Sequence, residues 1–291
     1  AINQLNLSPC TKFPNTLYTI PKEKYGMPED WTPKNATEDY GGELTLKEAL
    51  AGSVNVVTAK LIDMVHPKNV ASLAHRAGIT SEIPEVPAIA LGSVDLSLFE
   101  MVGAYATFAN KGLRVEPMMI LKIEDKNGTV LEQFIPTSKE VLSEESAYVV
   151  INLLEGVTQS GSGIRLRGKW GSYPDNVVTG YPYEFTNPIA GKTGTTQNQS
   201  DGWFMGIVPN LVTGVWVGGE DRATHFKSIT QGQGATMALP IWALYHKKIY
   251  ADSTLNVSQG EFERPEDLSI EVDCGKKGDQ AIKKLEEDPE F

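Results

Sequence analysis

The sequence predicts a mixed α/β protein of the α+β type, in which helices flank an antiparallel sheet. Apolar residues recur at helical spacing in four segments, 45–65, 70–77, 97–110 and 144–157. Three short runs rich in β-formers then follow closely, at Ala190 to Thr196, Trp203 to Val208 and Val212 to Val217. Because turn residues separate these runs, we expect consecutive antiparallel strands, closed by a helix over Ala238 to Tyr250.

The composition is that of an ordinary folded protein of enzyme size. The chain has 291 residues, of which 41% are hydrophobic and 22% charged. Its formal net charge of -11 argues against nucleic acid as a partner, since phosphate backbones attract basic proteins. No apolar run approaches the roughly 18 residues that span a bilayer, and no signal peptide is recognisable. We therefore expect no nucleic-acid partner and no membrane span within this chain.

The first predicted helical segment has a start signal and an internal break. Residues 1–43 show no sustained period and predict extended or loop structure. Thr45 and Glu48 have the Thr-x-x-Glu form of a capping box, which marks a helix start. Gly52-Ser53 interrupts the apolar pattern that follows, and both residues form helix poorly. We expect two short helices with a turn near Ser53.

The later elements follow from similar start and stop signals. Gly78 ends the second predicted helix, and Lys111-Gly112 ends the third, which begins near Ser97. Asp125-Lys126-Asn127-Gly128 lies between apolar stretches and predicts a hairpin over Met118 to Phe134. The glycine-rich stretch from Thr158 to Gly180 predicts a loop. Pro240 fits the last helix if it lies in the first turn.

The chain divides by composition into a body and a tail. Residues 1–252 carry the predicted helices and strands, whereas residues 253–291 are polar and acidic and predict a C-terminal extension or small appendage. Two cysteines, Cys10 and Cys274, form neither a disulfide framework nor a metal-ligand cluster. The histidines are scattered without paired spacing, so we expect no metal site: His66, His75, His225 and His246.

The segment Ala190 to Thr196, which reads AGKTGTT, is the most informative one chemically. It places the Lys192 cation beside hydroxyls and glycines, a combination suited to binding a carboxylate or a phosphate. A nucleotide-binding P-loop also contains Gly-Lys-Thr, but it needs a glycine where this chain has Thr186, and a helix after the lysine. Gly194, Gly202 and the alternating run after Gly202 favour a strand and turn instead.

The other enzymes that contain such a segment are the penicillin-recognising serine enzymes, in which a Lys-Thr-Gly strand lines the active site. The chain resembles this family over about residues 5–250, and in particular the transpeptidase domain of class A, or bifunctional, penicillin-binding proteins. Four motifs in family order carry the resemblance: Trp31 to Asn35, Ser53-Val54-Asn55, Ala90 to Gly112, and Lys192 to Thr195 followed by Asp201 to Phe204. The resemblance implies a serine β-lactamase/transpeptidase-like fold.

The resemblance also implies roles for individual residues. Lys192 would bind the terminal carboxylate of a donor peptide or of a β-lactam, while Thr193, Gly194, Thr195 and Thr196 line the same subsite, where Thr193 and Thr195 offer hydroxyls. The backbone N–H of Thr195 would form half of an oxyanion hole.

Two further catalytic roles follow from the Ser-x-Asn motif. Ser53 would relay a proton to or from the leaving amine, and Asn55 would bind the substrate amide and the catalytic lysine. Taken singly, these residues have simpler explanations. Ser53 and Asn55 could be a helix break with an N-cap, Lys192 a solvated lysine, and the threonines ordinary strand residues.

The family's nucleophilic Ser-x-x-Lys motif is absent from these 291 residues, because no serine has lysine three positions later. By resemblance, the motif would lie just before Ala1, together with its helix and earlier strands. We therefore expect this chain alone to be inactive and less stable than an intact domain. The alternative is a non-catalytic penicillin-binding-like module that binds peptidoglycan or a partner.

The resemblance finally implies a biological setting. The parent protein would be a D,D-transpeptidase that cross-links peptidoglycan stem peptides through a serine acyl-enzyme and is trapped by β-lactam antibiotics. It would need no cofactor. It would carry an upstream glycosyltransferase domain and act on the extracytoplasmic, periplasmic face of the inner membrane, anchored by a segment outside this chain.

Overall fold

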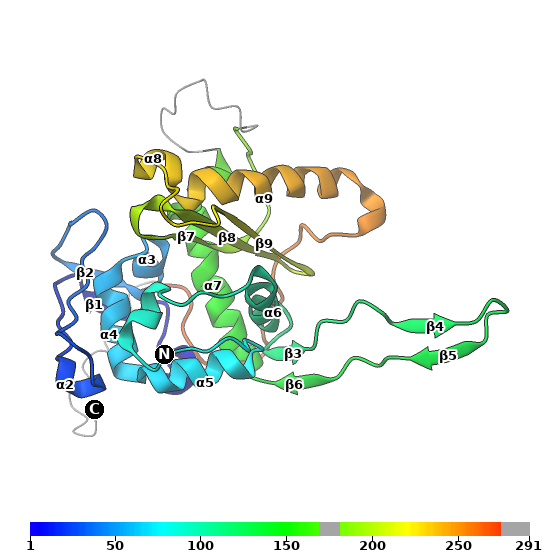
Figure 1. The fold of residues 1–291 in the computed structure, drawn as a ribbon, viewed down its shortest axis with the longest axis horizontal. Helices are drawn as coiled ribbons and strands as arrows, with labels where there is room; N and C mark the ends of the chain where they lie inside the picture. Colours follow the sequence, from blue (N-terminus) through cyan, green and yellow to red (C-terminus); the bar gives the residue numbers. More distant parts are fainter. Residues whose placement is uncertain (169–180, 275–291) are drawn as a thin grey trace.

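A computed structural model describes residues 1–168 and 181–274. Its centre is an antiparallel sheet of β7 (Ala190–Thr195), β8 (Asp201–Val208) and β9 (Leu211–Gly218), in that order. Helix α9 (Gly234–Ala251) covers one face of the sheet, while α6 (Leu98–Ala109) and α7 (Glu144–Ser160) lie on the other (Figure 1). This arrangement confirms the predicted fold class, the three strands in their predicted order and the closing helix.

The sheet separates two hydrophobic clusters because side chains alternate along β8. Phe204 and Val208 are fully buried on the side of α9, where they pack around Trp242. Ile207 points the other way and joins a cluster with residues of α7. Gly206 faces Trp242 so closely that an added Cβ would lie 2.5 Å from the indole, which explains why glycine occupies this position.

The two short helices predicted around Ser53 are present as α3 (Leu46–Ala51) and α4 (Asn55–Val65). Thr45 and Glu48 form the predicted capping box. Helix α5 (Pro67–Arg76) follows, and Gly78 comes after it with φ 110°, as its predicted role as a helix stop requires. Helices α3 and α4 pack with α7 around a core that contains Val56, Val57 and Val149 among its buried residues.

The remaining elements are short. The N-terminal region, predicted as extended, contains α1 (Ile2–Leu5), β1 (Lys12–Pro14), α2 (Lys22–Tyr25) and β2 (Glu43–Thr45), and β1 pairs with β2. Helical turns elsewhere are η1 (Pro87–Leu91), η2 (Ile164–Arg167), η3 (Gln197–Gln199), α8 (Ile229–Gly232) and η4 (Ser253–Leu255). The predicted loop from Thr158 to Gly180 is therefore wrong at its start, where α7 continues to Ser160 and η2 follows; residues 169–180 lie outside the described part.

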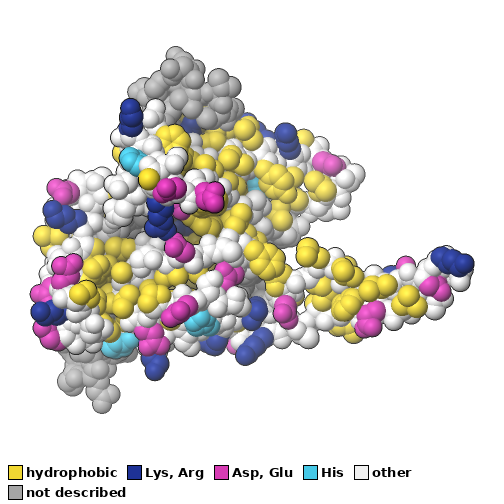
Figure 2. Space-filling view, in the orientation of Figure 1, with side chains coloured by type: hydrophobic (Ala, Val, Ile, Leu, Met, Phe, Trp, Pro, Cys, Tyr) yellow, Lys and Arg dark blue, Asp and Glu magenta, His cyan; other side chains and the backbone are white. Residues whose placement is uncertain are grey.

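A long two-stranded arm extends from the body between α6 and α7 (Figure 1). Its base pairs β3 (Leu113–Val115) with β6 (Ser138–Glu140), and its outer part pairs β4 (Lys122–Glu124) with β5 (Val130–Gln133). The Asp125 carboxylate accepts hydrogen bonds from the backbone N–H groups of Asn127 and Thr129, which fixes the turn. The predicted hairpin is confirmed. Apolar side chains cover much of the arm's surface (Figure 2).

Helix α9 begins earlier than the sequence predicts. It starts at Gly234, so Pro240 lies inside the helix and the predicted first-turn position is wrong. The glycines at 232 and 234 masked this start, since glycine lowers helix propensity. At Gly234 the glycine is needed, because an added Cβ would lie 2.3 Å from the carbonyl oxygen of Gly194.

The segment after Ser253 returns to the body as far as residue 274. Ile270 and Val272 are buried in the core that also contains Ile2 and Phe13. Cys10 forms a disulfide with Cys274, so the expectation that the two cysteines form no disulfide framework is wrong. The pairing was invisible in the sequence because 264 positions separate the two residues. Among residues 1–168 and 181–274, no helix is long and apolar enough to cross a membrane.

Candidate active site

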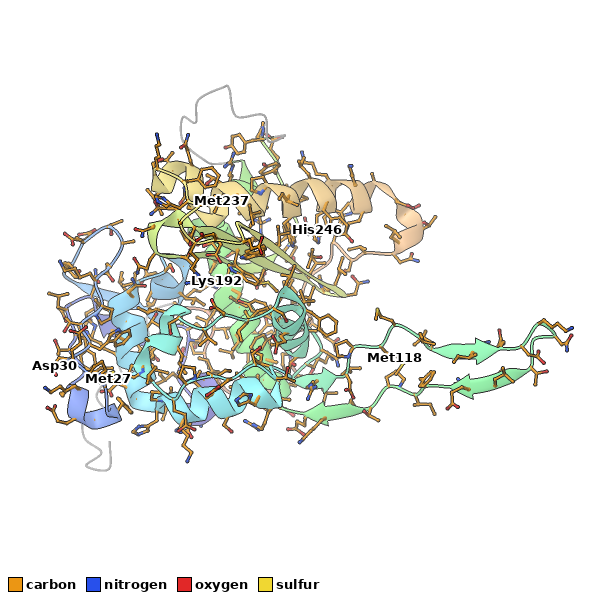
Figure 3. The ribbon with its side chains drawn as sticks, in the orientation of Figure 1. Met27, Asp30, Met118, Lys192, Met237 and His246 are labelled. Carbon is orange, nitrogen blue, oxygen red and sulfur yellow. A yellow bond between two sulfur atoms is a disulfide. The ribbon has the colours of Figure 1, made fainter. Side chains whose placement is uncertain are left out.

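Lys192 and Ser53 meet where the sheet joins the helical region. The Lys192 Nζ donates a hydrogen bond to the Ser53 Oγ at 3.0 Å, across 139 positions of sequence. A second bond, of 2.9 Å, runs from Nζ to the backbone carbonyl of Thr193. Figure 3 shows Lys192 at this junction, between β7 and the helices beneath it. Two predicted site residues from separate motifs are thus in direct contact.

Ser53 lies in the turn between α3 and α4 with a left-handed backbone, φ 55°. This conformation is unusual for a residue with a Cβ and presents the side chain outward from the helix break. The N-cap of α4 is Val54, which makes no side-chain capping bond. The plain helix-cap explanation of Ser53 therefore fails, because its hydroxyl contacts Lys192 instead of the helix backbone.

Asn55 is the first residue of α4, and its Nδ2 donates to the Lys34 carbonyl at 2.8 Å. The structure shows no hydrogen bond that joins Asn55 to Lys192 among the described residues. The neighbouring Asn35 is buried, and its Oδ1 accepts from the Val56 N–H at 3.2 Å. Sequence analysis assigned no role to Asn35, although it belongs to the Trp31–Asn35 motif. It supports the start of α4 and so the position of Asn55.

Burial lowers the pKa of Lys192 from its ordinary value of 10.5 to about 8. Within the described part of the chain, its ammonium group has hydroxyl and carbonyl partners but no carboxylate. A desolvated cation without a counter-ion is disposed to bind an anion, since an anionic ligand would restore the missing charge pairing. This electrostatic state fits a carboxylate subsite.

Ser162 is a site residue that sequence analysis missed within the predicted loop. Its Oγ lies 2.6 Å from the Thr193 Oγ1, and its backbone N–H donates to the Ala51 carbonyl at 3.0 Å. Gly161 allows this approach, because an added Cβ would lie 2.2 Å from the Ala51 oxygen. Ser162 thereby joins β7 to the end of α3, close to the Ser53 turn. The Gly161-Ser162-Gly163 pattern was the available signal.

The other threonines of β7 have different partners. The Thr195 Oγ1 accepts a hydrogen bond of 3.0 Å from the N–H of Gly234 at the start of α9. The Thr196 Oγ1 accepts from the Asp201 N–H at 3.0 Å and serves the turn into β8. Gly194 pairs with Trp203 across the sheet. Among the described strands β7 has β8 as its one neighbour, so its outer edge can offer backbone groups to a ligand.

The geometry excludes the nucleotide-binding alternative. Lys192 lies within a strand that pairs antiparallel with β8, whereas a P-loop lysine precedes a helix. No cluster of three or more histidine, cysteine, aspartate or glutamate side chains suited to a metal occurs among the described residues.

A lysine on the edge strand of an antiparallel sheet, bonded to a serine at the break between two helices, defines the class of penicillin-recognising enzymes. The family model described as "Penicillin binding protein transpeptidase domain" matches residues 7–228. The chain therefore belongs to the transpeptidase domain family of penicillin-binding proteins, a family of peptidoglycan acyltransferases, and its relatives place it with the class A proteins.

Penicillin-binding proteins 1A are similar to this chain. The protein of Aquifex aeolicus (strain VF5) is 37% identical over 221 residues, which cover 76% of this chain and 28% of that protein. The protein of Clostridium novyi (strain NT) is 31% identical over 258 residues, 86% of this chain and 27% of the relative. The chain thus spans little more than a quarter of the length of these relatives.

Solved structures share the fold. The penicillin-binding protein 1A of Haemophilus influenzae superposes with a TM-score of 0.73 at 23% identity, covering 89% of this chain and 41% of the other. The PonA1 protein of Mycobacterium tuberculosis, in complex with penicillin V, gives a TM-score of 0.73 at 22% identity, covering 94% and 71%.

Proposed function

We propose that the protein to which this chain belongs is a serine-type D,D-transpeptidase that cross-links peptidoglycan stem peptides. The observation that carries the proposal is the contact between Lys192 and Ser53, flanked by Thr193. This contact places a desolvated cation beside a hydroxyl that can transfer a proton. Acyl transfer from a peptide with a terminal carboxylate requires both, the cation to bind the carboxylate and the hydroxyl to move the proton.

The proposed chemistry assigns one task to each group. Lys192 holds the carboxylate of the terminal D-alanine, and the Thr193 hydroxyl donates to the same carboxylate. The Thr195 N–H, on the open edge of β7, stabilises the oxyanion of the tetrahedral intermediate; such a donor typically contributes about 3 kcal/mol. As the nucleophilic serine hydroxyl bonds to the acyl carbon and the peptide C–N bond breaks, Ser53 passes the proton released by that hydroxyl to the departing D-alanine amine, and Asn55 orients the substrate amide. An amine of a neighbouring stem then takes the acyl group.

The nucleophile of this reaction belongs to a Ser-x-x-Lys motif outside these 291 residues, which contain no such motif. We propose that this chain by itself does not acylate, that the whole protein also carries a glycosyltransferase domain, and that it works on the extracytoplasmic face of the membrane. The Cys10–Cys274 disulfide supports this location, because disulfides persist in oxidising compartments. β-Lactams would form a stable acyl-enzyme with it.

Covalent labelling with a fluorescent penicillin tests the proposal. The comparison uses this chain, a form extended upstream by roughly a hundred residues, and the extended form with Lys192→Ala. We expect labelling of the extended form alone, strongly reduced by Lys192→Ala. A Lys122→Ala variant on the distant arm is the matched control and should label normally.

The absence of Ser-x-x-Lys also favours a second candidate, a module that binds peptidoglycan or a partner without chemistry. If neither form labels while both are folded and bind peptidoglycan in a pull-down, the catalytic proposal is wrong and the binding module takes its place.

A further inference from the structure

A shallow depression of about 450 Å³ lies between α5 and the base of the arm, and it shares no lining residue with the Lys192 site. Figure 1 shows α5 running toward the start of β3 and the end of β6. Four basic side chains line it: Lys68 and Arg76 from α5, Arg114 from β3 and Lys139 from β6. Glu85 is the one carboxylate in the lining, so the depression is strongly positive.

The positive charges gather in an arrangement that is unfavourable without an anion. Arg114 and Lys139 are directly opposite each other in the antiparallel pair of β3 and β6. Like charges in this position destabilise a strand pair. None of the ion pairs among residues 1–168 and 181–274 includes either residue, nor Lys68 or Arg76.

Four basic side chains in one depression are unexpected in a chain that is acidic overall. The chain has 37 acidic and 26 basic residues, so carboxylates are the more abundant partners. Four cations nevertheless share one depression with a single carboxylate.

The lining is also held in place. Gly78 has φ 110°, and a Cβ there would lie 2.8 Å from the Arg114 Nε, so the guanidinium rests against the backbone at a position that only glycine leaves open. The His75 Nδ1 donates to the Ile79 carbonyl at 2.8 Å and fixes the imidazole at the rim. Arg114 can offer a planar pair of donors to an oxyanion, which suits phosphate.

We propose that this depression binds a phosphate group carried by a larger molecule, as a phosphomonoester or phosphodiester. A tetrahedral phosphate, doubly charged as a monoester and singly charged as a diester, could contact several of the four cations at once, and the volume leaves room for an ester substituent. An anionic lipid headgroup and a soluble phosphate ester both supply this chemistry. The inference is independent of the proposed transpeptidase activity, since the two sites have no residue in common.

Binding of glycerol 1-phosphate by calorimetry, and of vesicles of phosphatidylglycerol in phosphatidylcholine by co-sedimentation, tests the proposal on the full chain. We expect Lys139→Glu to weaken binding about tenfold or more, which corresponds to the loss of roughly one charge-assisted contact. Binding should also weaken with added salt. The matched control, Lys126→Glu at the turn of the same arm, makes the same charge change outside the depression and should bind as the unaltered chain does.

Thermal unfolding shows whether the Lys139→Glu variant is still folded. Lys139→Glu places a carboxylate opposite Arg114, so its midpoint of thermal unfolding without ligand should equal or exceed that of the unaltered chain. Binding of the ester alone identifies a soluble ligand, and binding to vesicles with phosphatidylglycerol but not to phosphatidylcholine alone identifies a lipid headgroup. The proposal is overturned if neither probe binds, or if Lys139→Glu and Lys126→Glu bind equally.

Discussion

The number of protons available at the site fixes the direction of the hydrogen bond between two of its side chains. The Ser162 and Thr193 hydroxyls are 2.6 Å apart, and each has one proton to donate. If Thr193 donates to a substrate carboxylate, as we propose, Ser162 must donate to Thr193. Ser162 is then a positioning residue, because it directs the Thr193 proton toward the ligand without touching the ligand itself.

We therefore expect Ser162→Ala, in the extended form, to slow acylation by a carboxylate-bearing β-lactam by about 3- to 10-fold, the typical net value of one hydrogen bond. Acylation by the methyl ester of the same β-lactam should change little, since Thr193 has no carboxylate to contact. Stopped-flow acylation rates with both compounds measure this difference. Ser162→Thr keeps the hydroxyl and should react normally; an equal loss with acid and ester would show a purely structural role.

At the scale of the elements, helices are positioned where their ends pack closely against the backbone of a neighbouring element at a glycine. Gly161 brings the end of α7 against α3, and Gly234 brings the start of α9 against β7. Helix α9 is anchored further along by Trp242, which packs on Phe204 and stacks on His246 with ring centroids 3.5 Å apart. His246 is fully buried, and burial lowers its pKa from 6.5 to about 4.

This lowered pKa predicts a loss of stability in acid. Between pH 6.5 and about 4 the unfolded chain binds a proton at residue 246 while the folded chain does not, so the free energy of unfolding falls as the pH falls. The contribution is complete above pH 6.5, and its full loss amounts to about 3 kcal/mol. Urea unfolding at several pH values measures it.

The substitution His246→Gln isolates this effect. Glutamine does not titrate, so the variant should show a flatter dependence on pH between 6.5 and 4, whatever its stability at neutral pH. The matched control is His225→Gln, which makes the same substitution at an exposed position. A pH dependence that is equally steep in His246→Gln would rule out His246 as its source.

At the scale of the whole molecule, the C-terminal segment completes the helical core. Ile270 and Val272 are buried beside residues from the start of the chain, and Glu145 accepts a hydrogen bond from the Ile270 N–H at 2.9 Å. The disulfide between Cys10 and Cys274 fixes this return. The division into residues 1–252 and 253–291 remains a prediction about composition, while residues 253–274 pack against the body.

We expect Cys274→Ser to lower the free energy of unfolding by about 2–5 kcal/mol, since the disulfide restricts a very long loop in the unfolded chain. Urea unfolding without reductant measures the loss. Cys10→Ser and the double variant should show the same loss, because either change removes the whole bond. Free thiols in the unaltered chain, or a loss in the double variant that is the sum of the two, would contradict the pairing.

The sequence by itself determined the local elements and the family. The capping box at Thr45, the break at Ser53 and the three strands follow from propensity and spacing, which act over a few residues. Most residues of the candidate site were also predicted from motifs, because a motif places side chains of a given chemistry at a fixed spacing in the sequence.

Only the tertiary structure decided which distant groups meet. The Lys192–Ser53 contact, the Ser162–Thr193 pair, the disulfide and the opposed Arg114 and Lys139 join segments between 25 and 264 positions apart. Such contacts depend on how the helices and the sheet pack, and packing is set by the whole core and by close approaches at single glycines. No local pattern in the sequence predicts which distant residues come into contact.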